Sequence, residues 1–204
     1  MIKVTPMPEY PGFDTEVRQR GAAFLATCPT PTSGQFKNRQ YWARATKELH
    51  KTYRGICSYT AMYLLEQGTV DHFLPKTTYP QLAYEWSNFR LASWRVNSAK
   101  GHKTNILDPF SIEDDWFQMD IPTCLIRANP ILEQRVRSQV SETISSLGLN
   151  SDDNYVQERC DILIYYARGN IDLAFVKRRY PFLAKELERQ RLGQNELRAL
   201  FKVD

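Results

Sequence analysis

The sequence predicts an α+β fold, in which a short pair of antiparallel strands and a following helix are embedded in a mostly helical chain. Residues 70–74 alternate loosely between apolar and polar side chains and end at Pro75, as a short strand does, and residues 89–93 offer a returning strand. From Pro130 onward the apolar residues recur at helical spacing. A chain of 204 residues is long enough to bury one substantial core.

Before the strands, prolines, capping residues and apolar spacing define the expected elements. Asp14 is a good helix cap, and Tyr41, Ala45 and Leu49 share one helical face. The elements expected here are an extended arm over 1–12, a helix from Asp14 to about Ala26, a loop over 29–34, a helix over 38–52, and a hairpin-like lead-in over 54–57 and 61–65.

After the strands, the pattern becomes helical. Ser151 or Asp152 is expected to cap one helix, and Pro181 suits the first turn of another. Leucines stripe the last helix, which predicts packing on its own core or, alternatively, docking of a partner. The elements expected here are a helix starting at Asn97, a short strand over 119–125, and helices over 131–146, 152–168, 171–179 and 181–201.

These elements suggest three parts of the chain. Residues 1–34 form an N-terminal arm and first helix, and residues 35–107 form a core that holds the strand pair. Residues 108–204 form a helical C-terminal region, which we expect to pack on that core.

The segment 69–101 holds an ordered set of polar residues. Asp71 and His72 are adjacent, Asn88 lies sixteen residues after His72, Asn97 follows nine residues later, and Lys100 and Gly101 come next. Each alone is common, since Asn is frequent at loop ends for turn chemistry, but the ordered set is far more specific. Neighbours on a strand point to opposite faces, so Asp71 and His72 need a twist to serve one site, or else address it from different sides.

This order resembles the HNH endonuclease family, whose ββα-metal finger carries an Asp-His pair, a mid-loop Asn, and a final His or Asn just inside a helix. The resemblance implies that Asp71 ligates the metal and that His72, not bound to it, deprotonates the attacking water. It also implies that Asn88 supports catalysis by holding the loop, and that Asn97 is the second protein ligand through its carbonyl oxygen. One carboxylate and one amide suit a single Mg²⁺ or Mn²⁺ ion.

One departure from the family concerns structural zinc. Many HNH proteins frame the finger with two Cys pairs, whereas here Cys57 stands alone upstream and residues 92–97 contain no cysteine. One thiolate cannot build a four-ligand zinc site, so we expect no structural zinc. Aromatic packing is expected to brace the finger instead, through Tyr59, Tyr63, Trp86 and Trp94.

Basic residues cluster on both sides of the motif. Residues 35–55 hold six basic side chains against one acidic, and residues 90–105 hold four basic and no acidic side chains. The first stretch is equally typical of a solvated helix face, while the second favours contact with nucleic acid. The residues expected to contact nucleic acid are Lys76, Arg90, Arg95, Lys100 and His102.

Taken together, these features predict a metal-dependent HNH endonuclease that hydrolyses DNA. The layout resembles the small HNH subunits that pair with an ABC-type ATPase in bacterial anti-phage systems of the Septu kind, including those attached to retrons. That resemblance implies an ATPase partner, which the acidic segment 108–120 or the last helix could bind. The alternative is a non-catalytic nucleic-acid-binding subunit, against which the presence of both Asp71 and His72 argues.

Composition also bears on where the protein acts. Four cysteines at 28, 57, 124 and 160 show no C-x-x-C spacing, so we expect neither a disulfide framework nor a metal ribbon. The apolar runs are far shorter than the roughly 20 residues that span a bilayer. With no apolar segment typical of a signal peptide at the start, we expect a reduced, cytoplasmic protein without membrane contact.

Overall fold

The computed structural model describes residues 1–203 and confirms the α+β class, with helices and two small antiparallel sheets. The chain forms two compact units. The first unit comprises Val4–Ser58 and Leu64–Thr104, and the second comprises Met1–Lys3, Tyr59–Tyr63 and the chain from Asn105 onward. Of the helices in residues 1–203, none combines the length and hydrophobicity that a membrane-spanning helix needs. The packing of residues 108–204 on the preceding core stays a prediction.

Short helices open the first unit. A π-helical turn at Asp14–Arg18 runs into α1 (Gln19–Thr27), and a 3₁₀ helix at Tyr41–Ala45 runs into α3 (Thr46–Thr52). The expected loop over 29–34 ends early, at Thr32, because Ser33–Lys37 forms the helix α2. A capping box explains it, because Thr32 accepts from the Gln35 amide while the Gln35 side chain accepts from the Thr32 amide.

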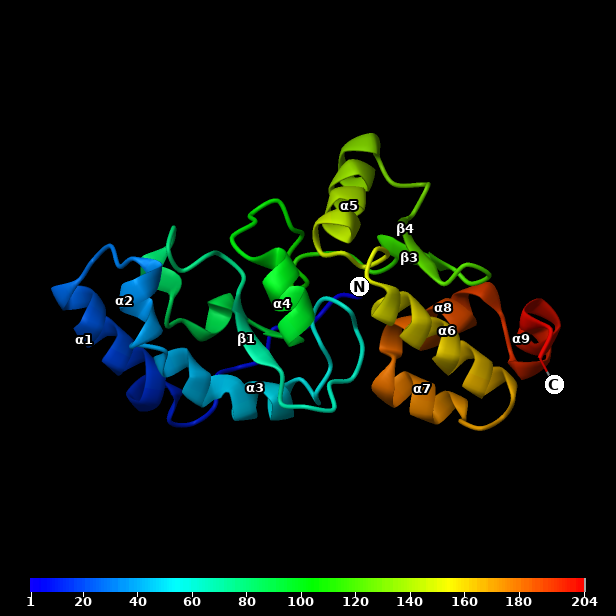
Figure 1. Ribbon diagram of the computed structural model, residues 1–204, viewed down its shortest axis with the longest axis horizontal. Helices are drawn as coiled ribbons and strands as arrows, with labels where there is room; N and C mark the ends of the chain where they lie inside the picture. The colour runs from blue at the N-terminus through cyan, green and yellow to red at the C-terminus, as the bar shows by residue number, and fades with distance from the viewer. Residues whose placement is uncertain (204) are drawn as a thin grey trace. The chain divides into compact units, whose positions relative to one another are not determined.

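The predicted strand pair is present. β1 (Thr69–His72) pairs antiparallel with β2 (Phe89–Ala92), so that Asp71 lies opposite Arg90 and His72 lies opposite Phe89. The helix α4 (Trp94–Lys100) follows and packs beside β1 (Figure 1). It begins earlier than expected, because the Ser93 hydroxyl accepts from the Val96 amide and caps it. Asn97 therefore lies within α4 and not at its start.

The hairpin-like lead-in is present only in part. The Leu64 amide donates to the Gly55 carbonyl at 2.7 Å and bridge residues occur at Ile56 and Tyr63, but residues 54–57 and 61–65 form no continuous strands. Backbone conformation gives the reason, since Arg54, Gly55 and Ala61 have φ angles of 53°, 70° and 54°. A strand needs a negative φ, so these left-handed residues interrupt both segments.

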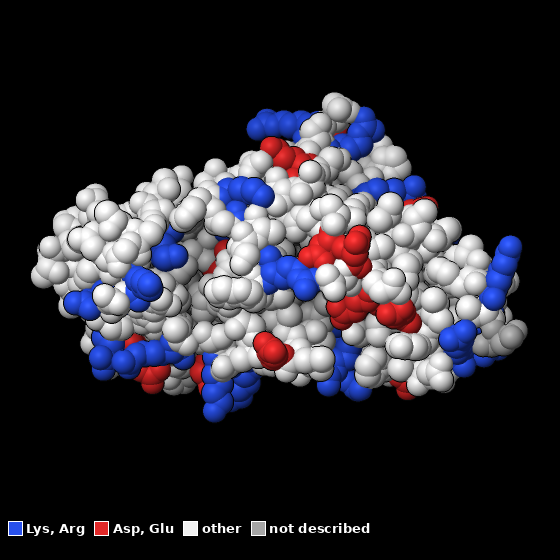
Figure 2. Space-filling view, in the orientation of Figure 1, with Lys and Arg blue, Asp and Glu red and all other residues white. Residues whose placement is uncertain are grey.

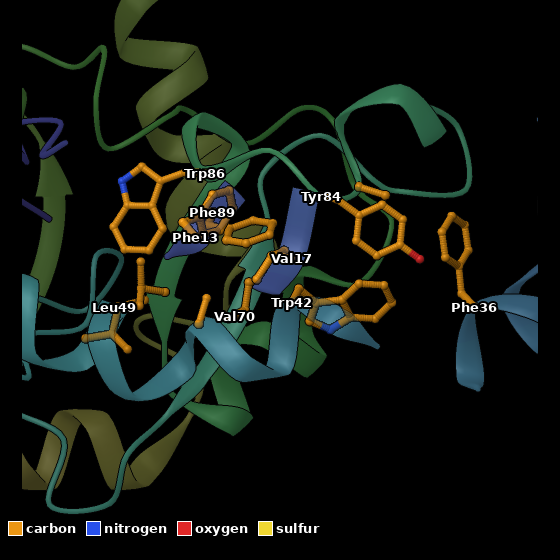
Figure 3. Close-up of a cluster of buried hydrophobic side chains, with 12 residues drawn as sticks. Phe13, Val17, Phe36, Trp42, Leu49, Val70, Tyr84, Trp86 and Phe89 are labelled. Atoms are coloured by element: carbon orange, nitrogen blue, oxygen red, sulfur yellow. The ribbon is translucent and has the colours of Figure 1, made fainter. Parts of the chain in front are cut away.

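An aromatic core stabilises the first unit. Phe13 packs edge-to-face on Trp86 and Phe89, with ring centroids 5.5 and 5.8 Å apart (Figure 3). Leu49 from α3 and Val70 from β1 join the same buried cluster. This core fixes β1 and the end of the 74–88 connection, the two segments that carry the candidate site.

As far as residue 203, the second unit contains a hairpin and five helices. β3 (Phe117–Asp120) pairs antiparallel with β4 (Leu125–Ala128), where one strand over 119–125 was expected. The tight turn between them requires a left-handed residue, and Cys124 has a φ of 57°. The helices are α5 (Gln134–Ser146), α6 (Asp153–Ala167), α7 (Leu173–Arg179), α8 (Pro181–Gln190) and α9 (Gln194–Phe201).

Two predicted helix starts are confirmed and one helix is divided. Asp152 caps α6 by accepting from the Asn154 amide, and Pro181 occupies the first turn of α8. The helix expected over 181–201 is two helices, because Arg191 adopts a left-handed φ of 56° just after α8. Gly193 then serves as the N-cap of α9.

Side chains hold the β3–β4 hairpin through its backbone. The fully buried Glu186 accepts from the Met119 amide at 2.8 Å, and the buried Arg159 donates to the Cys124 carbonyl at 2.7 Å. Cys124 is also bonded to Cys160 of α6, so the expectation that the cysteines form no disulfide is wrong for this pair. The cause lies in tertiary packing, which brings together two residues that are 36 positions apart.

Candidate functional site

The predicted base and the two predicted metal ligands line one cleft of the first unit. The cleft has a volume of about 420 Å³, and Asp71, His72 and Asn97 all line it. Residues in and between α2 and the 3₁₀ helix also line it, a region that the sequence linked to the site only through the basic stretch 35–55. These additional lining residues are Ser33, Phe36, Lys37, Gln40 and Trp42.

The His72 ring is held in one orientation. Its Nε2 lies 2.8 Å from the Ala83 carbonyl oxygen, which can only accept, so Nε2 carries the proton and Nδ1 has the lone pair in the neutral ring. Trp42 and Phe89 contact the ring edge-on, with centroids 4.8 and 5.4 Å away. The remaining nitrogen is thus the one available as a base.

Burial keeps His72 neutral. Removal from water lowers the pKa of His72 to about 3, the nearby Lys76 and Lys100 act in the same direction, and the Ala83 carbonyl opposes them. At pH 7 the imidazole is uncharged and can accept a proton. An anionic phosphate in the cleft would raise this pKa by favouring the imidazolium form.

Asp71 makes a buried ion pair with Lys100. The Lys100 ammonium lies 3.1 Å from Asp71 Oδ1 and donates to the His72 carbonyl oxygen at 2.8 Å. The Lys100 side chain is fully buried and that of Asp71 is 2% exposed. Lys100 of α4 therefore holds the end of β1 in place, and the phosphate contact expected of this lysine has no support from its placement.

Asn88 joins the loop after β1 to the start of β2. Its side-chain oxygen accepts from the Leu74 amide at 2.8 Å, and its nitrogen donates to the carbonyls of Leu74 and Leu82 at 3.0 and 3.2 Å. The side chain is 4% exposed and does not line the cleft. Its contribution to the site is the position of the loop, which includes Ala83.

The donors at the cleft fit a hard divalent cation. Asn97 uses its amide nitrogen for long contacts of 3.4 Å to Thr69 Oγ1 and 3.5 Å to the Val70 carbonyl, which leaves its oxygen available as a ligand atom. With the Asp71 carboxylate it gives two oxygen ligands, as Mg²⁺ or Mn²⁺ prefers. Across residues 1–203 no cluster of three or more His, Cys, Asp and Glu side chains is placed to hold a metal ion. The pair of Asp71 and Asn97 is not such a cluster, because it has one carboxylate and one amide.

The residues expected to contact nucleic acid divide into two groups. Lys76 and the exposed His102 line the cleft, whereas Arg90 and Arg95 do not. Arg90 is only 3% exposed and donates to the carbonyls of Ser87 and Phe89 at 2.8 and 2.9 Å. It therefore supports β2, and its placement does not favour a phosphate contact.

Positive charge is found at the cleft itself and does not extend over the whole surface. Figure 2 shows both signs of charge on the face in view, with the acidic side chains gathered mainly in one patch and the basic side chains scattered. At the cleft itself, Lys37 and Lys76 add positive charge, and the Lys76 ammonium lies 5.2 Å from the centre of the Trp42 ring. Burial lowers the pKa of Lys76, Asp71 opposes that shift and Lys100 adds to it.

The expected aromatic brace is wrong for Trp94. Trp86 is 6% exposed in the core, but Trp94 is 76% exposed at the cleft, while Tyr59 and Tyr63 belong to the second unit. Trp94 occupies the first position of α4, where the Ser93 cap turns the chain into the helix.

The sequence also held a signal for α2 that was not used. The T-x-x-Q pattern at 32–35 is typical of a capping box and could have revealed α2 and its cleft residues.

The chain was also compared with known proteins. No protein-family model matches it, and no curated protein matches its sequence. The assignment of function therefore depends on the geometry and chemistry of the cleft.

Proposed function

We propose that the chain is a metal-dependent endonuclease of the HNH type that hydrolyses DNA phosphodiester bonds, with β1, β2 and α4 as its ββα-metal finger. One observation carries the proposal: Asp71, His72 and Asn97 line a single cleft, and the Ala83 carbonyl fixes which nitrogen of His72 can act as the base. A site that only bound nucleic acid would not need the oriented imidazole, whereas the Asp71 carboxylate also serves the buried pair with Lys100.

In this proposal His72 acts through Nδ1. It takes a proton from a water molecule whose oxygen attacks phosphorus, the bond between phosphorus and the leaving oxygen breaks, and the leaving oxygen takes a proton from solvent. A positioned base typically contributes about 10²- to 10⁴-fold to the rate. A divalent cation held by Asp71 and Asn97 would stabilise negative charge on the phosphate and on the leaving oxygen.

Residues around the base position it and the substrate. Asn88 and Lys100 hold the two segments that carry Ala83, Asp71 and His72, so they act through other residues. Lys37, Lys76 and His102 line the cleft and can contact phosphates on either side of the cleaved bond.

A plasmid-nicking assay tests the proposal. The purified protein is expected to convert supercoiled DNA to nicked and linear forms with Mg²⁺ or Mn²⁺, and EDTA is expected to stop the reaction. The matched negative control is His72→Gln, since the glutamine amide can still donate to the Ala83 carbonyl but offers no imidazole base. Absence of cleavage of both the plasmid and a single-stranded DNA, with either cation, would refute the nuclease function, and metal-independent cleavage by both proteins would indicate a contaminant.

We also propose that the nuclease is the effector of an anti-phage complex with an ABC-type ATPase, which the layout resemblance alone supports. The surfaces first expected to bind that partner are partly used within the second unit, while the Asp114 and Asp115 side chains stay 63% and 52% exposed. Phe117 is 2% exposed, and Lys185 pairs with Asp114 and Asp115 at 3.1 and 3.0 Å. The leucine stripe is likewise mostly buried, as predicted for a core, at Leu183, Leu187 and Leu197.

Co-expression with a candidate ATPase tests this second proposal. Retention of the ATPase through affinity and size-exclusion chromatography is the expected result. A nuclease that elutes alone and cleaves DNA at full rate without the ATPase would contradict it.

A further inference from the structure

The exposed indole of Trp94 is a feature that the proposed chemistry does not use. All four tryptophans lie within residues 1–203, and Trp94 is 76% exposed, whereas Trp42 and Trp86 are 8% and 6% exposed. Trp94 also lines the cleft that holds Asp71 and His72. A large apolar ring in water beside the reactive groups is available to cover an apolar face of a ligand.

The position of Trp94 on α4 ties it to the reaction centre. Trp94 and Asn97 are three residues apart in the helix, so their side chains share one face and their Cβ atoms are about 5 to 6 Å apart. Of the two proposed metal ligands, Asn97 is the one closer in sequence to Trp94. A group that stacks on Trp94 would therefore lie next to the bond that is cleaved.

The charge around Trp94 identifies the ligand class. Lys37, Lys76 and His102 line the same cleft, and Asp71, the one carboxylate among its lining residues, is paired with Lys100. Positive side chains interleaved with an exposed aromatic ring are the features that bind a nucleic-acid strand, through its phosphates and its bases together. An apolar peptide would leave the ammonium groups of Lys37 and Lys76 without anionic partners.

The exposed ring further selects an unpaired base. Inside a duplex both faces of each base are covered by its neighbours, so an indole can stack only on a base that is single-stranded or turned out of the helix. We infer that Trp94 stacks on an unpaired base next to the cleaved phosphate, and that the site acts on single-stranded DNA. This inference rests on the proposed endonuclease function and adds its substrate class.

The test measures binding apart from cleavage. In the full chain carrying His72→Gln, we would compare Trp94, Trp94→Ala and Trp94→Phe for binding of a fluorescent single-stranded oligonucleotide and of its duplex, by anisotropy with Mg²⁺. Trp94→Ala is expected to weaken single-strand binding by about 5- to 150-fold, the range for loss of one stacked base. Duplex affinity is expected to change by less than about twofold, and Trp94→Phe to retain most single-strand affinity, because the phenyl ring still stacks.

Leu65→Ala is the matched control, since Leu65 is 93% exposed in the same unit but does not line the cleft. It is expected to leave both affinities unchanged. The inference is overturned if Trp94→Ala has no effect, or if it weakens single-strand and duplex binding equally. If Trp94→Ala loses single-strand binding but the native protein cleaves no DNA, the endonuclease function is refuted and the stacking site stands. If the native protein cleaves DNA and Trp94→Ala cleaves it equally well, the endonuclease function stands and the stacking site is refuted.

Discussion

Replacement of Lys100 by Met tests the buried ion pair that connects α4 to β1. Methionine keeps the length and apolar stem of lysine but lacks the ammonium. The change removes the 3.1 Å contact to Asp71 Oδ1 and the 2.8 Å hydrogen bond to the His72 carbonyl. Because Asp71 is 2% exposed, its carboxylate would remain buried beside an apolar side chain.

The expected loss of stability is large. Removing one partner of a buried pair typically costs about 3 to 5 kcal/mol, because the other charge is left uncompensated. For a chain of this size that corresponds to a decrease in Tm of roughly 6 to 20 °C. The double variant Asp71→Asn/Lys100→Met should recover part of this loss, since neither side chain is then charged, with a coupling free energy of about 0.5 to 3 kcal/mol.

Urea denaturation of the four proteins in this cycle measures the effect, with Lys103→Met as the control. Lys103 lies three residues after the end of α4 and is exposed, and its ammonium donates to the Ala99 carbonyl at 2.8 Å in contact with solvent. Its replacement should therefore change the free energy of unfolding by no more than about 0.5 kcal/mol. If Lys100→Met costs no more than Lys103→Met, the ion pair does not stabilise the fold, and the position of His72 needs another explanation.

Two further predictions concern the metal and the pH. Asp71→Asn and Asn97→Ala should each raise the Mg²⁺ concentration for half-maximal cleavage by about tenfold or more, as calorimetry can verify, and unchanged metal affinity in both variants would assign the ion to other ligands. Because the pKa of His72 is about 3 when folded and 6.5 when unfolded, the unfolded chain protonates first. The contribution of His72 to the free energy of unfolding is therefore fully present well above pH 6.5. It is lost as the pH falls toward 3, by up to about 4 kcal/mol. Urea curves of His72→Gln should lack this contribution, and the same pH dependence in both proteins would contradict the low pKa.

Local patterns in the sequence predicted the features that depend on neighbouring residues. Alternation ending at Pro75 located β1, and the cap and proline rules located the starts of α6 and α8. The order of Asp71, His72 and Asn97 selected three residues that line one cleft. These features follow from spacing along the chain, which the sequence states directly.

Features that depend on tertiary packing were missed. A lysine is usually exposed, and only the pairing of α4 with β1 places Lys100 in the interior, 29 residues after the carboxylate that it neutralises. The same holds for Arg90, whose guanidinium is taken up by two backbone carbonyls. Trp94 was missed for the opposite reason, since the expectation that aromatic residues are buried fails for a ring at the mouth of a cleft.

The most direct test of the account is single-turnover DNA cleavage by His72→Gln, compared with the native protein and with His50→Gln. His50 contacts the Leu64 carbonyl at 3.3 Å and does not line the cleft, so it controls for a general effect of replacing histidine. The account predicts a rate about 100-fold lower or more for His72→Gln, with DNA affinity unchanged and with His50→Gln near the native rate. Cleavage by His72→Gln within a few-fold of the native rate would contradict the assignment of His72 as the base.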